Sequence, residues 1–374
     1  MKRVEFVFYT LLVIYSCVST SCQKSNDDEC FNGDIHPIRD TIDRVETVKL
    51  QSVFLDGANY GTPFVYDSLI IFMNPKLKDH FYNVFNINTG QEIGVFCNKG
   101  GGPGEFYSLS LIYQLFKEKN ELKALLFEAH KENILIWNIS QSIREGKTII
   151  ETIPYTWKTE NNNACYSGLF LKSRNELLAK VAALPIDKDD ATLPIYQKRS
   201  IDANQCLRTY SIYKQTIKNS EASIIPEAFF NSSDAFKPDG TKIVQAMVHL
   251  PQLNIIDVET GKITGYRLEN GEDFSVFKGK KEIKNHFVRL AADDKFIYAL
   301  YWGKLPWGAR EIPYINTIYI FDWKGKLVSK IATDHDVDKM CVDTVRNRIY
   351  IIGPKTDDVF YYDLDELNKG SESR

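Results

Sequence analysis

The stretch YWGKLPWGAREIPY, residues 301–314, gathers aromatic rings and one arginine in a segment that we expect to join two strands. Exposed aromatic side chains beside an arginine are the groups that binding hot spots and sugar-stacking surfaces use. In the alternative interpretation, Pro306 and the tryptophans only pack a long loop against the domain. The candidate residues of this binding loop are Tyr301, Trp302, Trp307, Arg310 and Tyr314.

Histidines and carboxylates could also do chemistry, but their spacing selects no metal site. Asp334, Asp336 and Asp338 alternate as in a calcium loop, yet the glycine and the closing glutamate of such a loop are missing. We expect the other loop acids, such as Asp293 and Asp294, to be solvated, and the histidines to lie at strand ends or on the surface. The six histidines are His36, His80, His130, His249, His286 and His335. The sequence therefore predicts no metal and no cofactor.

Glycines dominate the segment CNKGGGPGEF, residues 97–106. Successive backbone N–H groups in such a run can bind an anion. A phosphate-binding loop, however, needs G-x-x-x-x-G-K-[ST] at the start of a helix, and neither feature follows here. We therefore expect Gly100, Gly101, Gly102 and Gly104 to form tight turns with positive φ, and Glu105 to cap or pair locally.

No catalytic residue can be named from the sequence. There is no G-x-S-x-G nucleophile motif and no sialidase-type aspartate box, and the carboxylate pair of a glycosidase is recognised only by its separation in space. A ring-shaped fold could still bring distant histidines together at one channel, as in a metal-dependent polysaccharide lyase. Whether the chain is an enzyme stays open, and the residues favour a protein that is not.

The N-terminus predicts an address outside the cytoplasm. A basic pair precedes an apolar run over residues 6–15, and small residues then lead to Cys22, which is the order of a secretory signal. The run is too short to span a bilayer of about 30 Å. The segment resembles a bacterial lipobox, with Ser19 where leucine is usual, so we expect lipidation at Cys22 and anchoring to the membrane. The alternative is cleavage near Ser21 and a periplasmic protein.

An acidic run, Ser25–Glu29, follows the expected lipidation site. Its composition is that of a solvated tether. It also resembles the tag that sends lipoproteins to the cell surface in one group of Gram-negative bacteria. We therefore expect an outer-membrane lipoprotein, exposed at the cell surface in one interpretation and facing the periplasm in the other.

Charge and cysteine content exclude other classes of protein. The net charge is −3, and no cluster of basic residues is present that could neutralise phosphates, so the sequence does not predict binding of nucleic acid. No later apolar run reaches the length of a membrane-spanning helix. The cysteines that remain in the mature chain include no C-x-x-C pair and allow at most two disulfides. They are Cys30, Cys97, Cys165, Cys206 and Cys341.

A repeated phrase predicts the fold. Alternating aromatic and aliphatic residues, a polar turn with glycine and a second alternating run occur at residues 81–96, 253–268 and 318–331. Period-two alternation around Asn-Thr-Gly, Glu-Thr-Gly and Lys-Gly turns indicates β-hairpins. Four-stranded units that recur every ~40–50 residues are typical of propellers. Six such units fit between residues 42 and 365.

The sequence therefore predicts an all-β fold, a six-bladed β-propeller whose ring is closed by an N-terminal strand joining the last blade. The last unit has three clear strands, and Arg44–Leu50 is expected to supply the fourth, which removes an open sheet edge. The expected domains are a lipoprotein signal peptide (1–21), an acidic tether (22–41), the propeller (42–365) and a disordered tail (366–374).

The segment Asp234–Tyr266 has a Pro-Asp-Gly turn between two expected strands and an aspartate before the last hairpin. With the GPGEF motif, it resembles the TolB-like six-bladed propeller lipoproteins of anaerobic Gram-negative bacteria. Because that family mostly lacks an assigned activity, the resemblance implies fold and location more than function. We expect a lipid-anchored envelope module that binds an envelope protein or a glycan without catalysis. The alternative is a propeller glycoside hydrolase or polysaccharide lyase acting at the central channel.

Overall fold

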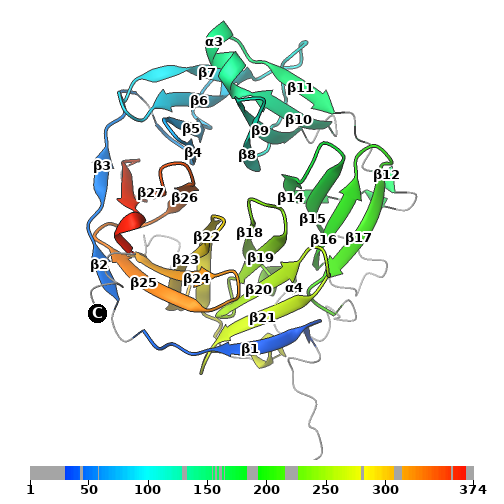
Figure 1. Cartoon of the computed structure of the whole chain (residues 1–374), viewed down its shortest axis with the longest axis vertical. Helices are drawn as coiled ribbons and strands as arrows, with labels where there is room; N and C mark the ends of the chain where they lie inside the picture. The colour runs from blue at the N-terminus through cyan, green and yellow to red at the C-terminus, as the bar shows by residue number, and fades with distance from the viewer. Residues whose placement is uncertain are drawn as a thin grey trace, which may run out of the picture.

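The structure is a computed structural model. It describes residues 30–42, 45–57, 59–128, 133–153, 155, 158–159, 162–163, 165–182, 193–214, 226–278, 282–306, 314–354 and 357–367. Six sheets lie around a common centre, as Figure 1 shows, so the predicted all-β six-bladed β-propeller is confirmed. Each blade has four antiparallel strands, and the first strand of each blade lies nearest the centre.

The blades follow one another along the chain. Blade one comprises β4 (Thr62–Tyr66), β5 (Leu69–Met73), β6 (His80–Asn86) and β7 (Glu92–Asn98). Blade two comprises β8 (Gln114–Glu118), β9 (Glu121–Glu128), β10 (Asn133–Asn138) and β11 (Ile150–Ile153). Blade three comprises β14 (Cys165–Leu171), β15 (Glu176–Ala182), β16 (Pro194–Ser200) and β17 (Gln205–Ser211).

The remaining blades complete the ring. Blade four comprises β18 (Ser232–Phe236), β19 (Lys242–Met247), β20 (Gln252–Asp257) and β21 (Ile263–Leu268). Blade five comprises β22 (Asn285–Ala292), β23 (Phe296–Lys304), β24 (Thr317–Asp322) and β25 (Leu327–Thr333). Blade six comprises β26 (Lys339–Asp343), β27 (Arg348–Ile352), β28 (Val359–Asp363) and the N-terminal β3 (Gln51–Val53).

Short elements lie outside the blades. A small ribbon pairs β12 (Lys158–Thr159) with β13 (Asn162–Asn163). Among the described residues, the helices are α3 (Ile139–Glu145), α4 (Pro226–Phe229) and α5 (Ser275–Lys278). Within the described ranges, no helix has the length and the apolar character that crossing a membrane would require.

The predicted hairpins are confirmed, and several share one turn geometry. In blade four, the Asp257 carboxylate accepts a hydrogen bond from the Thr260 backbone N–H at 2.8 Å, and Gly261 has φ +77°. In blade one, the Asn86 side-chain oxygen accepts a hydrogen bond from the Asn88 backbone N–H at 2.8 Å, and Gly90 has φ +76°. A side chain that closes the turn and a glycine in the left-handed region together fix the register of the two strands.

Apolar side chains fill the space between neighbouring blades. Between blades one and two, Trp137 is fully buried and its ring centre lies 5.4 Å from that of Tyr82. Its Nε1–H donates a hydrogen bond to the Ser142 hydroxyl at 2.9 Å. Because each blade buries both faces in this way, the ring is a rigid support for the loops at its two ends.

The N-terminal segment runs around the outside of three consecutive blades (Figure 1). Its first strand, β1 (Asp34–Ile38), pairs in parallel with β21 of blade four, and β2 (Glu46–Val48) pairs in parallel with β25 of blade five. The third strand, β3, pairs antiparallel with β28 and completes blade six. Between β1 and β2, the Asp40 carboxylate forms an ion pair with Lys330 of blade five.

Ring closure by an N-terminal strand is confirmed, but Arg44–Leu50 is not the closing strand. That segment contains β2, which adds a fifth strand to blade five, and the closing strand is the one that follows it. The segment expected to be a tether, 22–41, likewise reaches into the folded part. Phe31 is 3% exposed in the core beside blade four, and β1 covers the edge of that blade.

Two expectations about side chains differ from the structure. Cys30 and Cys97 are buried, as expected for cysteines that act as small hydrophobes, whereas Cys206 is exposed. No disulfide joins the described cysteine side chains. Asp293 was expected in solvent but is 7% exposed, because its carboxylate accepts hydrogen bonds from two backbone N–H groups and from the Tyr298 hydroxyl.

We predict that the closing segment depends on its buried side chains. Leu50 is 5% exposed in the core between blades five and six, so Leu50→Ala should lower the free energy of unfolding by about 2–5 kcal/mol. Phe54, four residues later, is 77% exposed, and Phe54→Ala should change the free energy of unfolding by less than about 0.5 kcal/mol. Urea titration of both variants checks this, and equal effects would show that Leu50 does not hold the closure.

Candidate functional site

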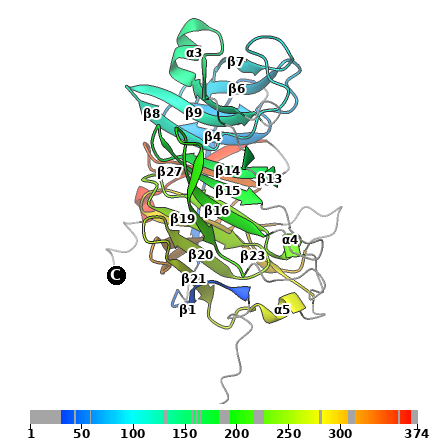
Figure 2. The same ribbon diagram turned by 90° about the vertical axis from the view of Figure 1, so that its right-hand side faces the viewer.

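The two ends of the ring differ in the length of their loops. Antiparallel strands place the first-to-second and third-to-fourth turns of the blades at one end. Most of these turns are short, as at 67–68, 119–120 and 293–295, and the exception is 139–149, which contains α3. Connections between blades, and between second and third strands, begin and end at the opposite end. The longest of them are 99–113, 183–193, 212–231, 269–284 and 305–316. We call this end the loop-rich face, and in Figure 2 α4 and α5 lie on the same side of the ring.

The predicted binding loop begins on this face but is not a single aromatic surface. Tyr301 lies on β23, and its ring stacks on Tyr319 at 4.5 Å between ring centres, within the core between blades four and five. Trp302 points to the other side of the strand, is half-buried against the core between blades five and six, and donates a hydrogen bond to the Leu305 carbonyl at 3.0 Å. Tyr314 is 59% exposed.

Two members of the predicted loop, Trp307 and Arg310, lie outside the described residues, as does the lipidation candidate Cys22. Tyr301 and Trp302 point in opposite directions because successive side chains of a strand lie on opposite faces of the sheet. Tyr301 therefore packs against the core between blades four and five. Among the loop residues that the structure describes, Tyr314 is the exposed aromatic.

A buried histidine lies next to this loop, at the start of β22. His286 is 2% exposed, and its Nε2 lies 3.3 Å from the Glu272 carboxylate. The same carboxylate binds the Lys284 ammonium at 2.7 Å, and His249 Nδ1 lies 3.3 Å from the Lys284 carbonyl oxygen. Burial lowers the pKa of His286 to about 4, against the opposing effect of Glu272. The sequence placed histidines at strand ends but gave no sign of this pairing, because Glu272 belongs to a separate connection.

We predict that His286 makes the fold less stable in mild acid. Between pH 6.5 and about 4, the unfolded chain binds a proton at this residue and the folded chain does not, so the free energy of unfolding falls as pH is lowered through this window. His286→Gln should reduce the difference in unfolding free energy between pH 7 and pH 4.5 by roughly 1–3 kcal/mol. Urea titrations at both pH values measure it, and an unchanged difference would contradict the assignment. The control is His36→Gln, which removes an imidazole side chain from an exposed position.

Two charged residues of innermost strands, Asp234 and Arg289, bind residues of a neighbouring blade. Asp234 of blade four forms an ion pair with Lys180 of blade three and accepts a hydrogen bond from the Tyr196 hydroxyl at 2.7 Å. Arg289 of blade five donates to the Asp338 backbone carbonyl at 2.9 Å. Over the part of the chain that the structure describes, no three His, Cys, Asp or Glu side chains gather as metal ligands. These pairs join blades and do not converge on one point.

The glycine-rich segment 97–106 is structural. The Glu105 carboxylate accepts the backbone N–H of Gly102 at 2.8 Å, as expected for local capping. A side chain at Gly100, where φ is +150°, would place its Cβ 2.1 Å from that carboxylate. The loop's own carboxylate therefore already occupies the Gly102 N–H, and the run leads to Phe106, which is buried in the core between blades one and two.

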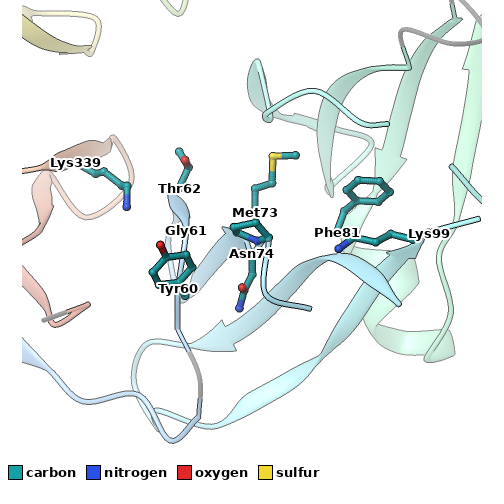
Figure 3. A pocket seen from close by; sticks show the side chains of 9 residues that line it. Tyr60, Gly61, Thr62, Met73, Asn74, Phe81, Lys99 and Lys339 are labelled. Atoms are coloured by element: carbon teal, nitrogen blue, oxygen red, sulfur yellow. The ribbon is translucent and has the colours of Figure 1, made fainter. Parts of the chain in front are cut away.

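A pocket of about 430 Å³ opens on the loop-rich face where blades six and one meet (Figure 3). Gly61 at its floor has φ +108°, and a Cβ there would lie 1.9 Å from the Met73 carbonyl oxygen, so this position requires glycine. The lining residues are Tyr60, Gly61, Thr62, Met73, Asn74, Pro75, Phe81, Lys99 and Lys339. Most of this site was missed from the sequence, and its one signal was Lys99, beside the glycine-rich run.

Lysine ammonium groups lie close to the aromatic rings of this pocket. The Lys76 ammonium lies 3.4 Å from the centre of the Tyr60 ring, and the Lys339 ammonium lies 5.8 Å from it. The Lys99 ammonium lies 5.4 Å from the centre of the Phe81 ring and donates to the Leu77 carbonyl. Such cation–π contacts hold the lysine side chains over the pocket. The arrangement can bind a ligand that combines negative charge with a ring or an apolar body.

Comparison with known proteins supports the fold. A family model described as TolB-like 6-blade propeller-like matches residues 194–345, which confirms the resemblance to TolB-like propellers. A solved structure of a DUF4221 family member from Bacteroides vulgatus has a TM-score of 0.57 at 12% identity and covers 85% of this chain and 96% of its own. At this identity the likeness shows the propeller fold alone.

A second solved structure, described as an exported protein of Bacteroides fragilis, has a TM-score of 0.48 at 13% identity, with 86% of this chain and 88% of that chain covered. No curated protein matches the sequence. The function must therefore be argued from the residues of this chain.

Proposed function

We propose that this chain is a lipid-anchored propeller of the cell envelope whose loop-rich face binds a protein or glycan partner without catalysis. The observation that carries the proposal is the concentration of long connections, exposed Tyr314 and the lysine-aromatic pocket on one face of a rigid ring. Binding sites on rigid scaffolds are built from such loops. Asp234 and Arg289 of the innermost strands bind residues of neighbouring blades, which supports a structural role for them over chemistry at the channel.

The place where the chain enters the propeller supports a partner in the same envelope. The Cys30 carbonyl accepts a hydrogen bond from the Lys214 backbone N–H at 2.9 Å, in a connection of the loop-rich face. Residues between Cys22 and Cys30 can span at most roughly 30 Å, since an extended chain gains about 3.3–3.6 Å per residue. A lipid on Cys22 would therefore hold this side of the ring close to the membrane surface.

We predict that Cys22→Ala releases the protein from the membrane. Several acyl chains, each contributing ~0.8 kcal/mol per buried CH₂, hold a lipoprotein on a bilayer, so their loss should lower the membrane-bound fraction roughly tenfold or more. Fractionation of cells that express each form measures this. Cys206→Ala, at an exposed cysteine of the propeller, should stay with the membrane. Equal distribution of the two variants would contradict lipidation at Cys22.

We predict that a partner is captured through the loop-rich face. Affinity capture of the tagged full chain from cross-linked intact cells should yield a reproducible envelope protein or glycan. A variant with alanine at Trp307, Arg310 and Tyr314 should lose most of it, because aromatic and arginine side chains dominate such interfaces. Trp302 is left unchanged, since it packs on the core.

The matched control for the capture is Val345→Ala, which truncates a side chain 52% exposed in a turn at the opposite end of the ring. Capture that survives the loop variant but not the control would contradict the assignment of the face. An empty capture from cells in which the protein is anchored would contradict the binding role, and hydrolysis and lyase assays on polysaccharides would then test the channel.

A further inference from the structure

The charged residues that line the pocket at the junction of blades six and one are all positive. Two lysines, Lys99 and Lys339, line it, and none of its nine lining residues carries a carboxylate. Figure 3 shows Lys339 reaching in from blade six and Lys99 from blade one, with Met73 and Asn74 between them. Both ammonium groups border the space that a ligand would occupy, so an anionic group placed against either lysine would be attracted to it.

Each lysine is held by its own blade. The Lys99 backbone N–H donates to the Asp79 carbonyl at 2.8 Å, and its ammonium donates to the Leu77 carbonyl. Lys339 begins β26 and lies 3.4 Å from the Asp338 carboxylate, which is outside the lining. Both ammonium groups have donors to spare, since a lysine ammonium carries three. The site is therefore pre-organised for a negatively charged group.

The rest of the pocket fits a ring better than an inorganic ion. Its volume of about 430 Å³ lies in the range of small-molecule sites and far exceeds that of a sulfate or phosphate ion. Phe81 and Met73 offer apolar surface, while the Thr62 hydroxyl is of the kind that binds sugar hydroxyls. An aromatic ring can stack on a sugar while a hydroxyl binds its oxygen atoms.

We propose that this pocket binds an acidic carbohydrate of about disaccharide size, whose carboxylate or sulfate groups bind the Lys99 and Lys339 ammonium groups. The proposal rests on the binding role of the loop-rich face and names the class of ligand for one site on it. Carboxylate and sulfate share the chemistry that the lysines recognise, and the two sources are separated by experiment.

The test is calorimetric titration of the full chain, purified in a nonionic detergent, with four probes. The acidic probes are a sulfated heparin disaccharide and digalacturonate, and the neutral probes are maltose and cellobiose. We expect saturable binding of at least one acidic probe, at least about tenfold tighter than either neutral probe and weaker at high salt. Whichever acidic probe binds more tightly identifies sulfate or carboxylate as the preferred group.

Lys99→Gln and Lys339→Gln should each weaken binding about tenfold, the effect of losing one charged hydrogen bond. The matched control is Lys324→Gln, which removes the same charge from an exposed turn at the opposite end of the ring and should bind as the wild type does. Urea titration of all three variants checks that they fold equally well. The proposal is overturned if neither acidic probe binds, if neutral probes bind as tightly, or if both pocket variants bind unchanged.

The outcomes separate this proposal from the general one. A captured envelope partner together with no binding of either acidic probe would leave the binding role of the face intact and overturn the ligand class. Binding of an acidic probe that both pocket variants weaken would support the ligand class even where capture of a protein partner fails.

Discussion

The pairing of β3 with β28 closes the ring, and the rest of the structure depends on it. The ladder is short, running from Val53 opposite Val359 to Gln51 opposite Tyr361. Backbone hydrogen bonds contribute only about 1 kcal/mol each after exchange with water. The closure therefore relies on apolar burial of about 1.5–3 kcal/mol for each side chain, supplied by Val48 and Leu50 in the core between blades five and six.

The candidate pocket is a product of that closure. Tyr60 and Gly61 lie on the connection from the closing strand to β4, and Lys339 begins the first strand of blade six. The two walls thus come from opposite ends of the propeller sequence and meet only when the ring is complete. Each lysine is held by its own blade, Lys339 by the Asp338 carboxylate and Lys99 by the Leu77 carbonyl. Ring closure therefore brings two positive charges to one pocket.

The sequence predicted the parts of the fold that local chemistry decides. Asp257 and Gly261 specify a hairpin wherever they occur, because a side chain closes the turn and glycine accepts positive φ. The closing strand was misplaced since β2 and β3 are both short extended segments, and alternation does not tell which edge each one joins. The pocket and the pairing of His286 with Glu272 join residues from separate connections, so spacing along the chain carries no trace of them. The predicted binding loop begins too early at Tyr301, because β23 continues to Lys304.

The outer strands of the N-terminal segment connect the expected anchor to the ring. The segment enters beside blades three and four, covers the edges of blades four and five, and ends by completing blade six. The segment that follows a lipid on Cys22 would thus be attached to three blades of the ring instead of one. The pocket lies between blades six and one, and Figure 1 shows these two blades across the ring from blades three and four. Anchoring and ligand binding therefore use different blades of the same loop-rich face, and neither needs the strands that the other occupies.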